Sequence, residues 1–435
     1  MIKLNHTLVG TVLLVFVFSF VPQQSVRAQP LLEKAVADLY AACLFKSVDN
    51  NPFSEAVTLA EQSFAPGIAG FIESNLASIP LTPPALEAEF SEQGIVEVVT
   101  GFTPIYTESS ASVGEGLFFM GANVSHFNLS KIRGEDLDAL RFVFQQNNGA
   151  DQIVVNMPMN VSATVFTLHG TYGITDRFDV GFALPIVSLG IDNVNTTFTV
   201  EGDNSGCRYG TGEQVNLTCD GQGTNRSISP ALFSRADGEP SSRETFLETV
   251  ALRAKYRFPV SVSTVRLAAV MDIRLPLRTS DNMLGSGNFG TKFTFISEYN
   301  PLSTFQPYVN VGAQFWNGPT SNSFNIGTGF NQQLATNLFF SFDLVGKIDL
   351  EPDAFLSPIG GALSPGDNAN TLETTNALIS TSIPAVNRDH TLNAGLGFQF
   401  AFSPSIHAYG SALFSLIDHG LQSDIVPTAG IAAHF

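Results

Sequence analysis

The pattern of hydrophobic and polar positions has a period of two over most of the chain, from about residue 112 to residue 435. In HTLNAGLGFQF, at 390–400, apolar residues alternate with threonine, asparagine, glycine and glutamine. The stretches 265–275 and 338–350 alternate in the same way, and their second face carries charged and small residues. A membrane β-barrel needs an apolar outer face and a polar inner face on every strand. The pattern therefore predicts an all-β protein, an antiparallel outer-membrane β-barrel.

The predicted connections alternate between short and long. Short turns are expected at 172–179, 257–264, 299–306, 330–337 and 402–407, and long polar loops at 200–243, 277–288, 316–323, 351–389 and 417–424. Short turns at one rim and long loops at the other are typical of outer-membrane barrels, with the turns in the periplasm. The count gives about 12 strands if the first is 112–129, and 14 if 98–109 and 140–146 are added.

The N-terminal part of the chain has a different pattern. Residues 1–28 are typical of a cleaved export signal, because Lys3 precedes an apolar stretch that is too short to span a bilayer. In 29–85 apolar residues recur at spacings of three and four, which predicts a small α-helical periplasmic or plug region. We take 86–111 as a linker or an additional β-hairpin, and 112–435 as the transmembrane barrel.

Composition and charge narrow the partners. The chain is 44% hydrophobic and only 14% charged, and its formal net charge is −18 at pH 7. Contacts with phosphate groups need clusters of lysine and arginine, which the sequence lacks, so we expect no nucleic acid as a partner. Export permits disulfides, and we predict one between Cys207 and Cys219 in a polar loop. Cys43 is left as a buried helix residue.

The last predicted strand, 424–435, keeps an outward apolar file up to Phe435. A barrel has no free edge when its last strand pairs with its first, and a terminal aromatic residue then lies in the interfacial aromatic belt. Phe435 also resembles the signal that the bacterial outer-membrane barrel assembly machinery recognises. We therefore expect this machinery and outer-membrane lipid as partners. In another strand the apolar file changes face near Pro185, which predicts a β-bulge.

Charged residues recur on the inner face of several predicted strands. The expected lumen-facing pore charges are Arg253, Lys255, Arg257, Arg266, Asp272, Arg274, Lys292, Glu298, Asp343, Lys347 and Asp349. Basic residues on neighbouring strands are predicted to form one wall, opposite an acidic wall at Asp343 and Asp349. Opposed walls of this kind orient polar solutes in a pore. The alternative is a salt-bridged interior with a structural role only.

Motifs for catalysis, metals and cofactors are weak. GSGNFG at 285–290 matches G-x-G-x-x-G, but it precedes an alternating strand and so lacks the strand–turn–helix context of a dinucleotide site. The histidines have no metal-ligand spacing, and we expect no metal or cofactor. His407 and Ser411 share an inward file, which leaves an outer-membrane barrel hydrolase as a distant alternative.

Several segments resemble the outer-membrane transporter family linked to the meta-pathway of phenol degradation. They are YGITDRFDVGFALPIV at 172–187, VALRAKYRF at 250–258, MDIRLPLRTSDNMLGSG at 271–287 and the final SDIVPTAGIAAHF. The resemblance covers roughly residues 112–435. It implies a barrel porin or channel associated with the catabolism of hydrophobic or aromatic compounds, and it defines no ligand residues.

These observations predict an outer-membrane, porin-like transporter that passes small-molecule solutes by diffusion through a charged lumen. Hydrophobic or aromatic compounds are the solutes that the resemblance suggests. A closed structural or adhesive surface barrel is the main alternative, because long polar loops suit it equally well.

Overall fold

The computed structural model describes residues 86–90, 96–102, 104–146, 151–156, 158, 160–192, 197–202, 207–209, 217–219, 226–228, 242–247, 249–260, 264–277, 289–299, 304–317, 321–350, 369–373, 377–384, 388–403 and 405–435. The regions predicted at 1–28 and 29–85, with Cys43, lie outside these residues. No helix within the described ranges is long and apolar enough to cross a membrane.

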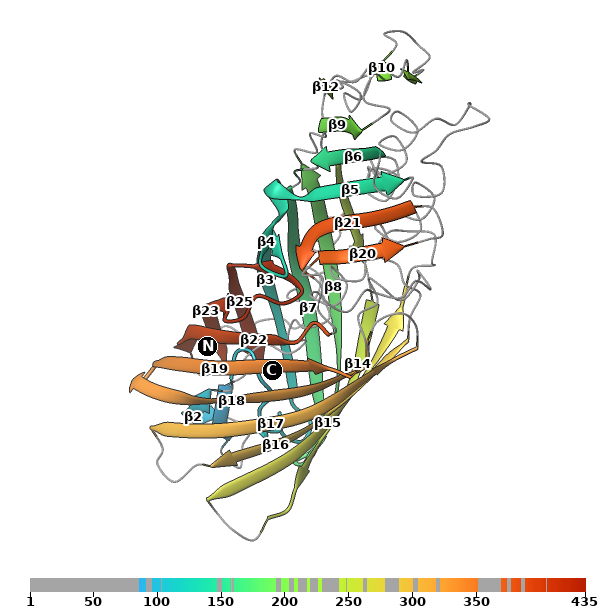
Figure 1. The fold of residues 1–435 in the computed structure, drawn as a ribbon. Coiled ribbons are helices and arrows are strands. Elements are labelled where there is room, and N and C mark those ends of the chain that lie inside the picture. Colours follow the sequence, from blue (N-terminus) through green and yellow to red (C-terminus); the bar gives the residue numbers. More distant parts are fainter. Residues whose placement is uncertain are drawn as a thin grey trace.

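Most of the described chain forms a closed antiparallel β-barrel of 12 strands (Figure 1). The strands are β3 (Phe118–Ile132), β7 (Asn160–Thr175), β8 (Phe178–Asp192), β14 (Thr249–Phe258), β15 (Val265–Pro276), β16 (Gly290–Tyr299), β17 (Phe305–Trp316), β18 (Ser323–Ala335), β19 (Leu338–Asp349), β22 (Thr391–Ser403), β23 (Ile406–Ser415) and β25 (Ile425–His434). The last strand, β25, pairs with the first, β3, which closes the barrel. The predicted fold class and the strand number of 12 are confirmed.

Short connections lie at one end of the barrel, which we call the turn end, and long connections lie at the other, the loop end. The turns after β7 and β18 have two residues each, 176–177 and 336–337. At the turn end the amide of Phe118 donates to the carbonyl of Phe435 at 3.0 Å, and the reverse bond is 2.8 Å long. These bonds hold the ends of the closing strands together.

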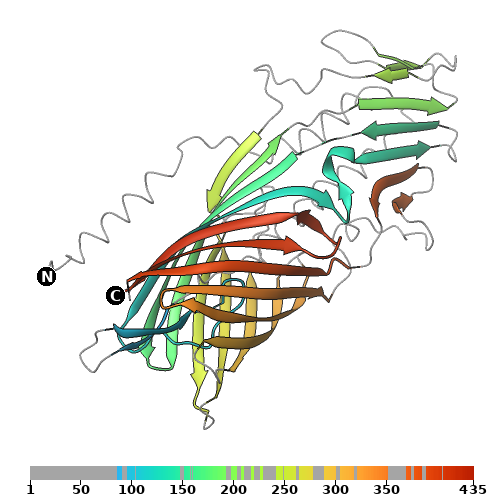
Figure 2. The same ribbon diagram turned by 90° about the vertical axis from the view of Figure 1, so that its left-hand side faces the viewer.

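A second sheet of six strands lies beyond the loop end (Figures 1 and 2). Its order is β12 (Arg226–Ile228), β9 (Thr197–Gly202), β6 (Asp151–Asn156), β5 (Arg141–Gln146), β21 (Ala377–Pro384) and β20 (Ala369–Glu373). These strands come from three of the long connections. The stretch 140–146, one of the two extra strands of the 14-strand alternative, therefore belongs to this sheet and not to the barrel wall.

The remaining elements are short. A hairpin of β1 (Leu86–Phe90) and β2 (Val96–Phe102) precedes the barrel and pairs only within itself. At the loop end β13 (Ser242–Leu247) pairs with β8, and β4 (Glu135–Asp136) and β24 (Leu421–Ser423) pair with β3. A 3-10 helix, η1 (Leu137–Ala139), follows β4, and β10 (Cys207–Tyr209) pairs with β11 (Leu217–Cys219).

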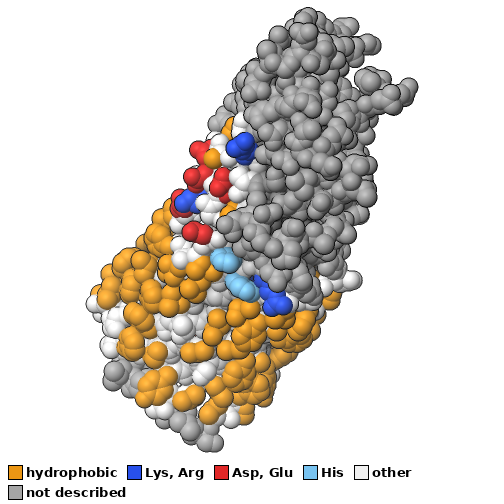
Figure 3. Space-filling view, viewed as in Figure 1, with side chains coloured by type: hydrophobic (Ala, Val, Ile, Leu, Met, Phe, Trp, Pro, Cys, Tyr) orange, Lys and Arg blue, Asp and Glu red, His pale blue; other side chains and the backbone are white. Residues whose placement is uncertain are grey.

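The outer face of the barrel is apolar, as Figure 3 shows by the orange side chains over its lower part. Large hydrophobic side chains that point outward and stay exposed include Leu252, Tyr256, Phe293, Phe295, Val309, Phe315, Ile326, Leu396, Phe398 and Ile431. Leaving such a continuous apolar surface in water is unfavourable, and lipid is the environment that matches it. The surface therefore fits a barrel that spans a membrane.

The β-bulge predicted near Pro185 is wrong. β7 and β8 keep a regular register through this point, with Thr167 opposite Pro185 and Val165 opposite Val187. The apolar file changes face because the inner surface of these long strands becomes apolar towards the loop end. There Val161, Val165 and Val187 are buried. Beyond Ile186 the outward positions of β8 are Ser188 and Gly190, so the apolar residues pass from the outer to the inner face without a change of register.

An ion pair ties the connections at the loop end together. Arg133, whose φ is 52°, and Gly134, whose φ is 83°, form the turn between β3 and β4. The Arg133 side chain is buried, and its Nε and Nη2 donate to the Asp389 carboxylate at 3.0 and 2.7 Å. Asp389 also accepts a bond from the amide of Gly420 at 2.8 Å. One carboxylate thus joins three connections.

Candidate functional site

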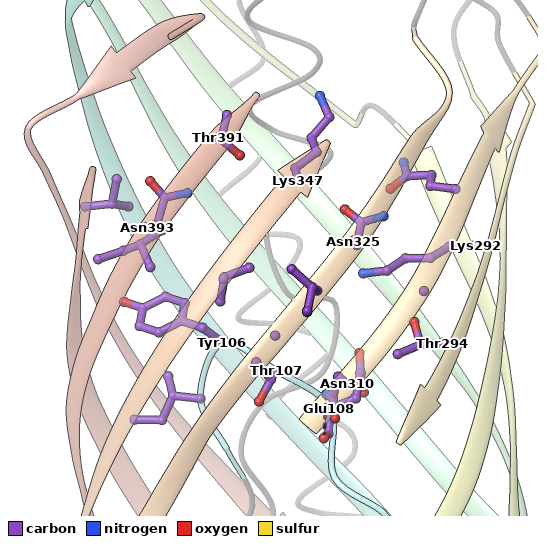
Figure 4. A pocket seen from close by; sticks show the side chains of 18 of the residues that line it. Tyr106, Thr107, Glu108, Lys292, Thr294, Asn310, Asn325, Lys347, Thr391 and Asn393 are labelled. Carbon is purple, nitrogen blue, oxygen red and sulfur yellow. Dashed lines mark hydrogen bonds between the residues drawn. The ribbon is translucent and has the colours of Figure 1, made fainter. Parts of the chain in front are cut away.

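The lumen contains a stretch of the chain itself, residues 104–117, which we call the inner segment. It follows β2, precedes β3 and forms no helix or strand. Its first residues contact β18, β19, β22 and β23, and its last residues contact β7 and β8. It therefore crosses the lumen. Figure 4 shows Tyr106, Thr107 and Glu108 on this segment, below the side chains of Lys347 and Asn325.

Asp343 of β19 binds the start of the inner segment. Its carboxylate accepts hydrogen bonds from the amide of Tyr106 at 3.4 Å and the hydroxyl of Thr107 at 3.0 Å. The Tyr308 hydroxyl of β17 donates to the same carboxylate at 2.8 Å. The hydroxyls of Tyr106 and Ser411 lie 2.8 Å apart. Tyr106 is not part of a barrel strand, and burial raises the pKa of its phenol to about 12, so this bond joins two neutral groups.

Glu108 forms the charged contact of the inner segment with the wall. Arg253 of β14 donates from Nη1 and Nη2 to the two Glu108 oxygens at 2.9 and 2.8 Å. The same guanidinium donates from Nη2 to Asp272 of β15 at 2.8 Å. The side-chain amide of Asn310 donates to the Glu108 carbonyl at 2.8 Å. Two carboxylates thus share one buried arginine, and one of them comes from the inner segment.

Two further wall carboxylates bind the last part of the segment. Glu298 of β16 accepts bonds from the Ser110 amide at 2.8 Å and from the Ser110 hydroxyl. Asp179 of β8 accepts bonds from the Ser112 hydroxyl at 2.7 Å and from the Val113 amide at 3.3 Å. A buried carboxylate is costly unless hydrogen bonds satisfy it, and here the segment supplies them.

Glycines in the wall make room for the inner segment. A Cβ atom on Gly327 of β18 would lie 2.6 Å from Cγ2 of Thr107. A Cβ on Gly395 of β22 would lie 2.8 Å from Cε2 of Tyr106, and Gly397 lies under the residue that precedes Tyr106. Contacts this short do not occur between real side chains, so these wall positions admit the segment because they lack a side chain.

The inner segment reverses direction before it enters β3. Gly114 and Gly116 have φ values of 98° and 75°, which favour glycine. The Leu117 amide donates to the Gly114 carbonyl at 3.2 Å, and the Gly116 amide donates to the Gly173 carbonyl of β7 at 2.9 Å. This turn connects the segment to the barrel wall at the turn end.

The lumen is packed at the turn end. Val113 of the inner segment packs with Phe119 and Ala432 of the wall, and Leu117 packs against them. Three histidine rings lie around Phe119, with ring centroids 4.7 to 6.3 Å from its own: His169, His407 and His434. Together with the inner segment, these side chains narrow the path through the barrel.

A cavity lies above the inner segment, between it and the loop end. Its volume, including the part open to solvent, is about 1310 Å³. Tyr106, Thr107 and Glu108 lie at its floor (Figure 4). Its wall carries amide, hydroxyl and ammonium groups, namely Asn123, Lys292, Thr294, Asn310, Gln314, Asn325, Lys347, Thr391, Asn393 and Thr428, with Trp316 and several aliphatic side chains between them.

The other predicted pore charges lie on the inner side of the wall, next to partners. Lys255 Nζ is 3.8 Å from Asp179, and Lys347 Nζ is 3.0 Å from Asp349. Arg266 lies opposite Glu298 in the strand register.

The remaining predicted charges belong to the group around Arg253 or to the strand end beside it. Lys292 lies opposite both Asp272 and Gln314 in the strand register. The Arg274 guanidinium lies over the Trp316 ring, 5.7 Å from its centroid. Arg257 is half-buried near the turn end of β14, where its amide donates to the Arg177 carbonyl at 2.8 Å.

The segregation of these charges into a basic and an acidic wall is a wrong prediction. Asp179 and Asp272 lie among the cations of β14 and β15, and both form ion pairs there. Asp343, which was expected to face the cations, instead binds hydroxyl and amide groups. The interior is closer to the alternative prediction, an interior with salt bridges, and the inner segment contributes to these through Glu108.

Sequence reasoning missed Glu108, Tyr106, Asp179 and Tyr308 as lumen residues. Asp179 stood at the edge of a predicted turn, although it follows the inward alternation of β8. Glu108 and Tyr106 belong to a stretch without a period of two, for which the sequence predicts a linker or an additional β-hairpin. A polar stretch directly before the first barrel strand, TPIYTESSAS at 103–112, was the available signal.

Two other predicted pairs of residues can be located in the structure. The register of β10 and β11 sets Cys207 opposite Cys219, and opposite Cα atoms in such a pair are about 4.5–5.5 Å apart, a separation that a disulfide can span. The disulfide itself stays a prediction. His407 and Ser411 are four residues apart on β23, about 13 Å along a strand, which is too far for a nucleophile and its base.

Among the described residues, no group of three or more His, Cys, Asp or Glu side chains is arranged to hold a metal ion. No protein-family model matches the chain. No curated protein matches it either.

Comparison with solved structures finds outer-membrane channels and porins. An outer membrane channel from Pseudomonas putida F1 has a TM-score of 0.44 at 10% identity, over 76% of this chain and 99% of the other. The CymD monoaromatic hydrocarbon channel has a TM-score of 0.33 at 10% identity, over 74% and 89%. The KdgM porin in complex with disordered oligogalacturonate has a TM-score of 0.33 at 5% identity, over 68% and 98%. Likenesses this distant carry no argument about what this chain transports.

Proposed function

We propose that the protein is an outer-membrane channel through which small molecules diffuse. The observation that carries the proposal is the cavity lined by polar side chains inside a closed barrel whose outer face is apolar. A barrel of 12 strands is wider than filled barrels of about 8 strands and narrower than open porins of about 16 strands. A lumen of this width, lined by polar groups and narrowed by a stretch of its own chain, suits a selective pore for small solutes.

The solute is the finer part of the proposal. Amides, hydroxyls and two lysines around the cavity suit polar groups, while Trp316, Phe127 and the Tyr106 ring offer apolar contact. This mixture supports amphipathic compounds, including the aromatic ones that the family resemblance implies. Outer-membrane insertion by the barrel assembly machinery, with Phe435 in its recognition signal, belongs to the same proposal.

Conductance tests the proposal directly. The full chain, refolded in detergent and inserted into planar bilayers in KCl, should produce discrete current steps, and liposomes that contain it should swell in small sugars. Heat-denatured protein serves as the control for detergent leakage. A barrel that neither conducts nor swells liposomes would contradict the channel.

A closed structural barrel is the second candidate. The packing of Val113 and Leu117 against Phe119 favours it, because that layer narrows the lumen at the turn end. It predicts no current from the wild type and none from variants that displace the inner segment. The channel predicts that such variants conduct more than the wild type.

A further inference from the structure

We propose that Arg253 is the centre of a carboxylate-binding site in the lumen, filled here by Glu108 of the inner segment, and that the carboxylate of a solute takes the place of Glu108. This inference rests on the proposed function, because it names the class of solute that the channel recognises.

The geometry around Arg253 is that of a carboxylate receptor. Two parallel N–H···O bonds of 2.9 and 2.8 Å join its guanidinium to both oxygens of Glu108. This fork arrangement is the one that arginine uses to bind planar anions, and it is stronger than a single neutral hydrogen bond. The side chains of Arg253 and Glu108 are only 8% and 11% exposed, so water screens the pair weakly.

Basic side chains outnumber carboxylates around this pair. Arg274 and Lys292 lie within electrostatic reach of Asp272, as does Arg253. With Glu108 in place, three cations face two carboxylates. When the inner segment withdraws, the same three cations face Asp272 alone. A buried group of cations favours an anion in the vacated position, because an uncompensated buried charge is costly.

The site is accessible from the cavity. Glu108 and Lys292 both line the cavity, with Asn310 and Gln314 beside them. A solute that enters from the loop end therefore meets the ion pair at the floor. The body of that solute would lie among the amide and hydroxyl groups of the cavity wall, so a carboxylate attached to a polar body fits better than a simple ion.

Glu108 can exchange with a solute because it belongs to the inner segment and not to a strand. Glu108 is the residue of the segment that forms an ion pair with the wall in this structure, while the bonds to Asp343, Glu298 and Asp179 come from neutral groups. Solvent that enters the cavity can hydrate these three carboxylates when the segment moves. Gly114 and Gly116 allow the chain to bend where the segment joins β3. The segment takes part in none of the strand pairs that close the barrel, so its displacement breaks none of their hydrogen bonds.

Hydrogen exchange measured by mass spectrometry tests the site on the full chain in detergent. The peptide that covers the inner segment reports on its release. In Glu108→Gln the ion pair is lost, and we expect exchange of this peptide to rise on the order of tenfold or more. Glu115→Gln is the matched control, because Glu115 is an exposed carboxylate of the same segment. Exchange in this control should equal that of the wild type.

Glucuronate and glucose are the probes, since they share a body and differ by one carboxylate. Millimolar glucuronate should raise exchange of the inner segment in the wild type, and glucose should not. In equilibrium dialysis, Glu108→Gln should bind glucuronate at least about tenfold more tightly than the wild type, because the competing carboxylate is gone. Arg253→Gln should lose this binding.

Two results would overturn the proposal. One is equal exchange in Glu108→Gln and Glu115→Gln, and the other is an identical response to glucuronate and glucose in both assays. Neither readout needs flux through the barrel. A protein that binds glucuronate but does not conduct would therefore contradict the channel and support the carboxylate site. A protein that conducts but does not respond to the carboxylate would support the channel and contradict the site.

Discussion

Placing a methyl group on Gly395 should loosen the inner segment without changing any charge. The Cβ of alanine at this position would lie 2.8 Å from Cε2 of Tyr106 and 3.3 Å from Cβ of Asp343. The aromatic ring cannot bend away as a long flexible side chain can. Either the Tyr106 ring moves away from the wall or strand β22 shifts. We expect the ring to move, because the inner segment is not held by strand pairing and β22 is.

The size of the effect follows from the overlap. Overpacking by one methylene or methyl group costs about 1–3 kcal/mol. This cost falls on the docked state alone, because the new methyl group meets open lumen once the segment has left. The intrinsic gain of replacing glycine by alanine in a strand is present in both states and cancels. At about 1.4 kcal/mol per factor of ten, the population with a released segment should rise roughly 5- to 150-fold.

The assay combines hydrogen exchange of the inner segment with conductance of the reconstituted barrel. Gly410→Ala is the matched control, since it lies on β23, the strand next to β22, and nothing is within 4 Å of its added Cβ. We expect faster exchange and larger currents in Gly395→Ala, and wild-type values in Gly410→Ala. Equal behaviour of the two variants would show that Tyr106 does not occupy the wall as described, and the steric argument would fail.

Three further predictions concern other parts of the molecule. Asp389→Asn removes the counter-charge of the buried Arg133, and breaking such a pair costs about 3–5 kcal/mol. Thermal melts should therefore show a clearly lower midpoint than the wild type. An unchanged midpoint would mean that this ion pair does not contribute to stability. Mass spectrometry of a non-reduced digest should find Cys207 linked to Cys219, and free thiols at both would refute the link. Phe295, which is 48% exposed, should face the middle of the bilayer, so Phe295→Arg should weaken folding into vesicles by about 2–4 kcal/mol, whereas a loss below about 1 kcal/mol would place it outside the lipid belt.

The barrel wall was predictable because each of its strands satisfies two environments at once. Residues such as Leu396 and Phe398 point outward, while Gly395 and Gln399 point into the lumen. Apolar residues and small or polar residues therefore alternate in the sequence with a period of two. Turn lengths then fixed which end each connection belongs to. This logic failed at Pro185, where the inner face is packed with apolar side chains and the outer face becomes polar a few residues later.

The inner segment was not predictable from the same signal. It meets the wall through partners that are far away in the chain: Asp179 is 66 positions from Val113, and Ser411 is 305 positions from Tyr106. Its own residues have no periodicity. The segment forms no helix or strand, so the side chains that point to the wall do not recur at a fixed spacing. The strands of the second sheet were missed for a different reason. They are short, as in β12 and β20, and the sheet is held together by pairs between different connections, β6 with β9 and β21 with β5.

The inner segment and the barrel strands are under different evolutionary constraints. A substitution in a barrel strand must suit lipid on one side, solute on the other, and the register of two neighbouring strands. A substitution at Glu108 or Ser110 must suit only the lumen. In the channel that we propose, solute specificity can therefore change through substitutions in the 14 residues of the inner segment, 104–117, while the barrel wall stays as it is. Descendants of one barrel can acquire different solutes by editing this peptide, and a protein engineer can do the same.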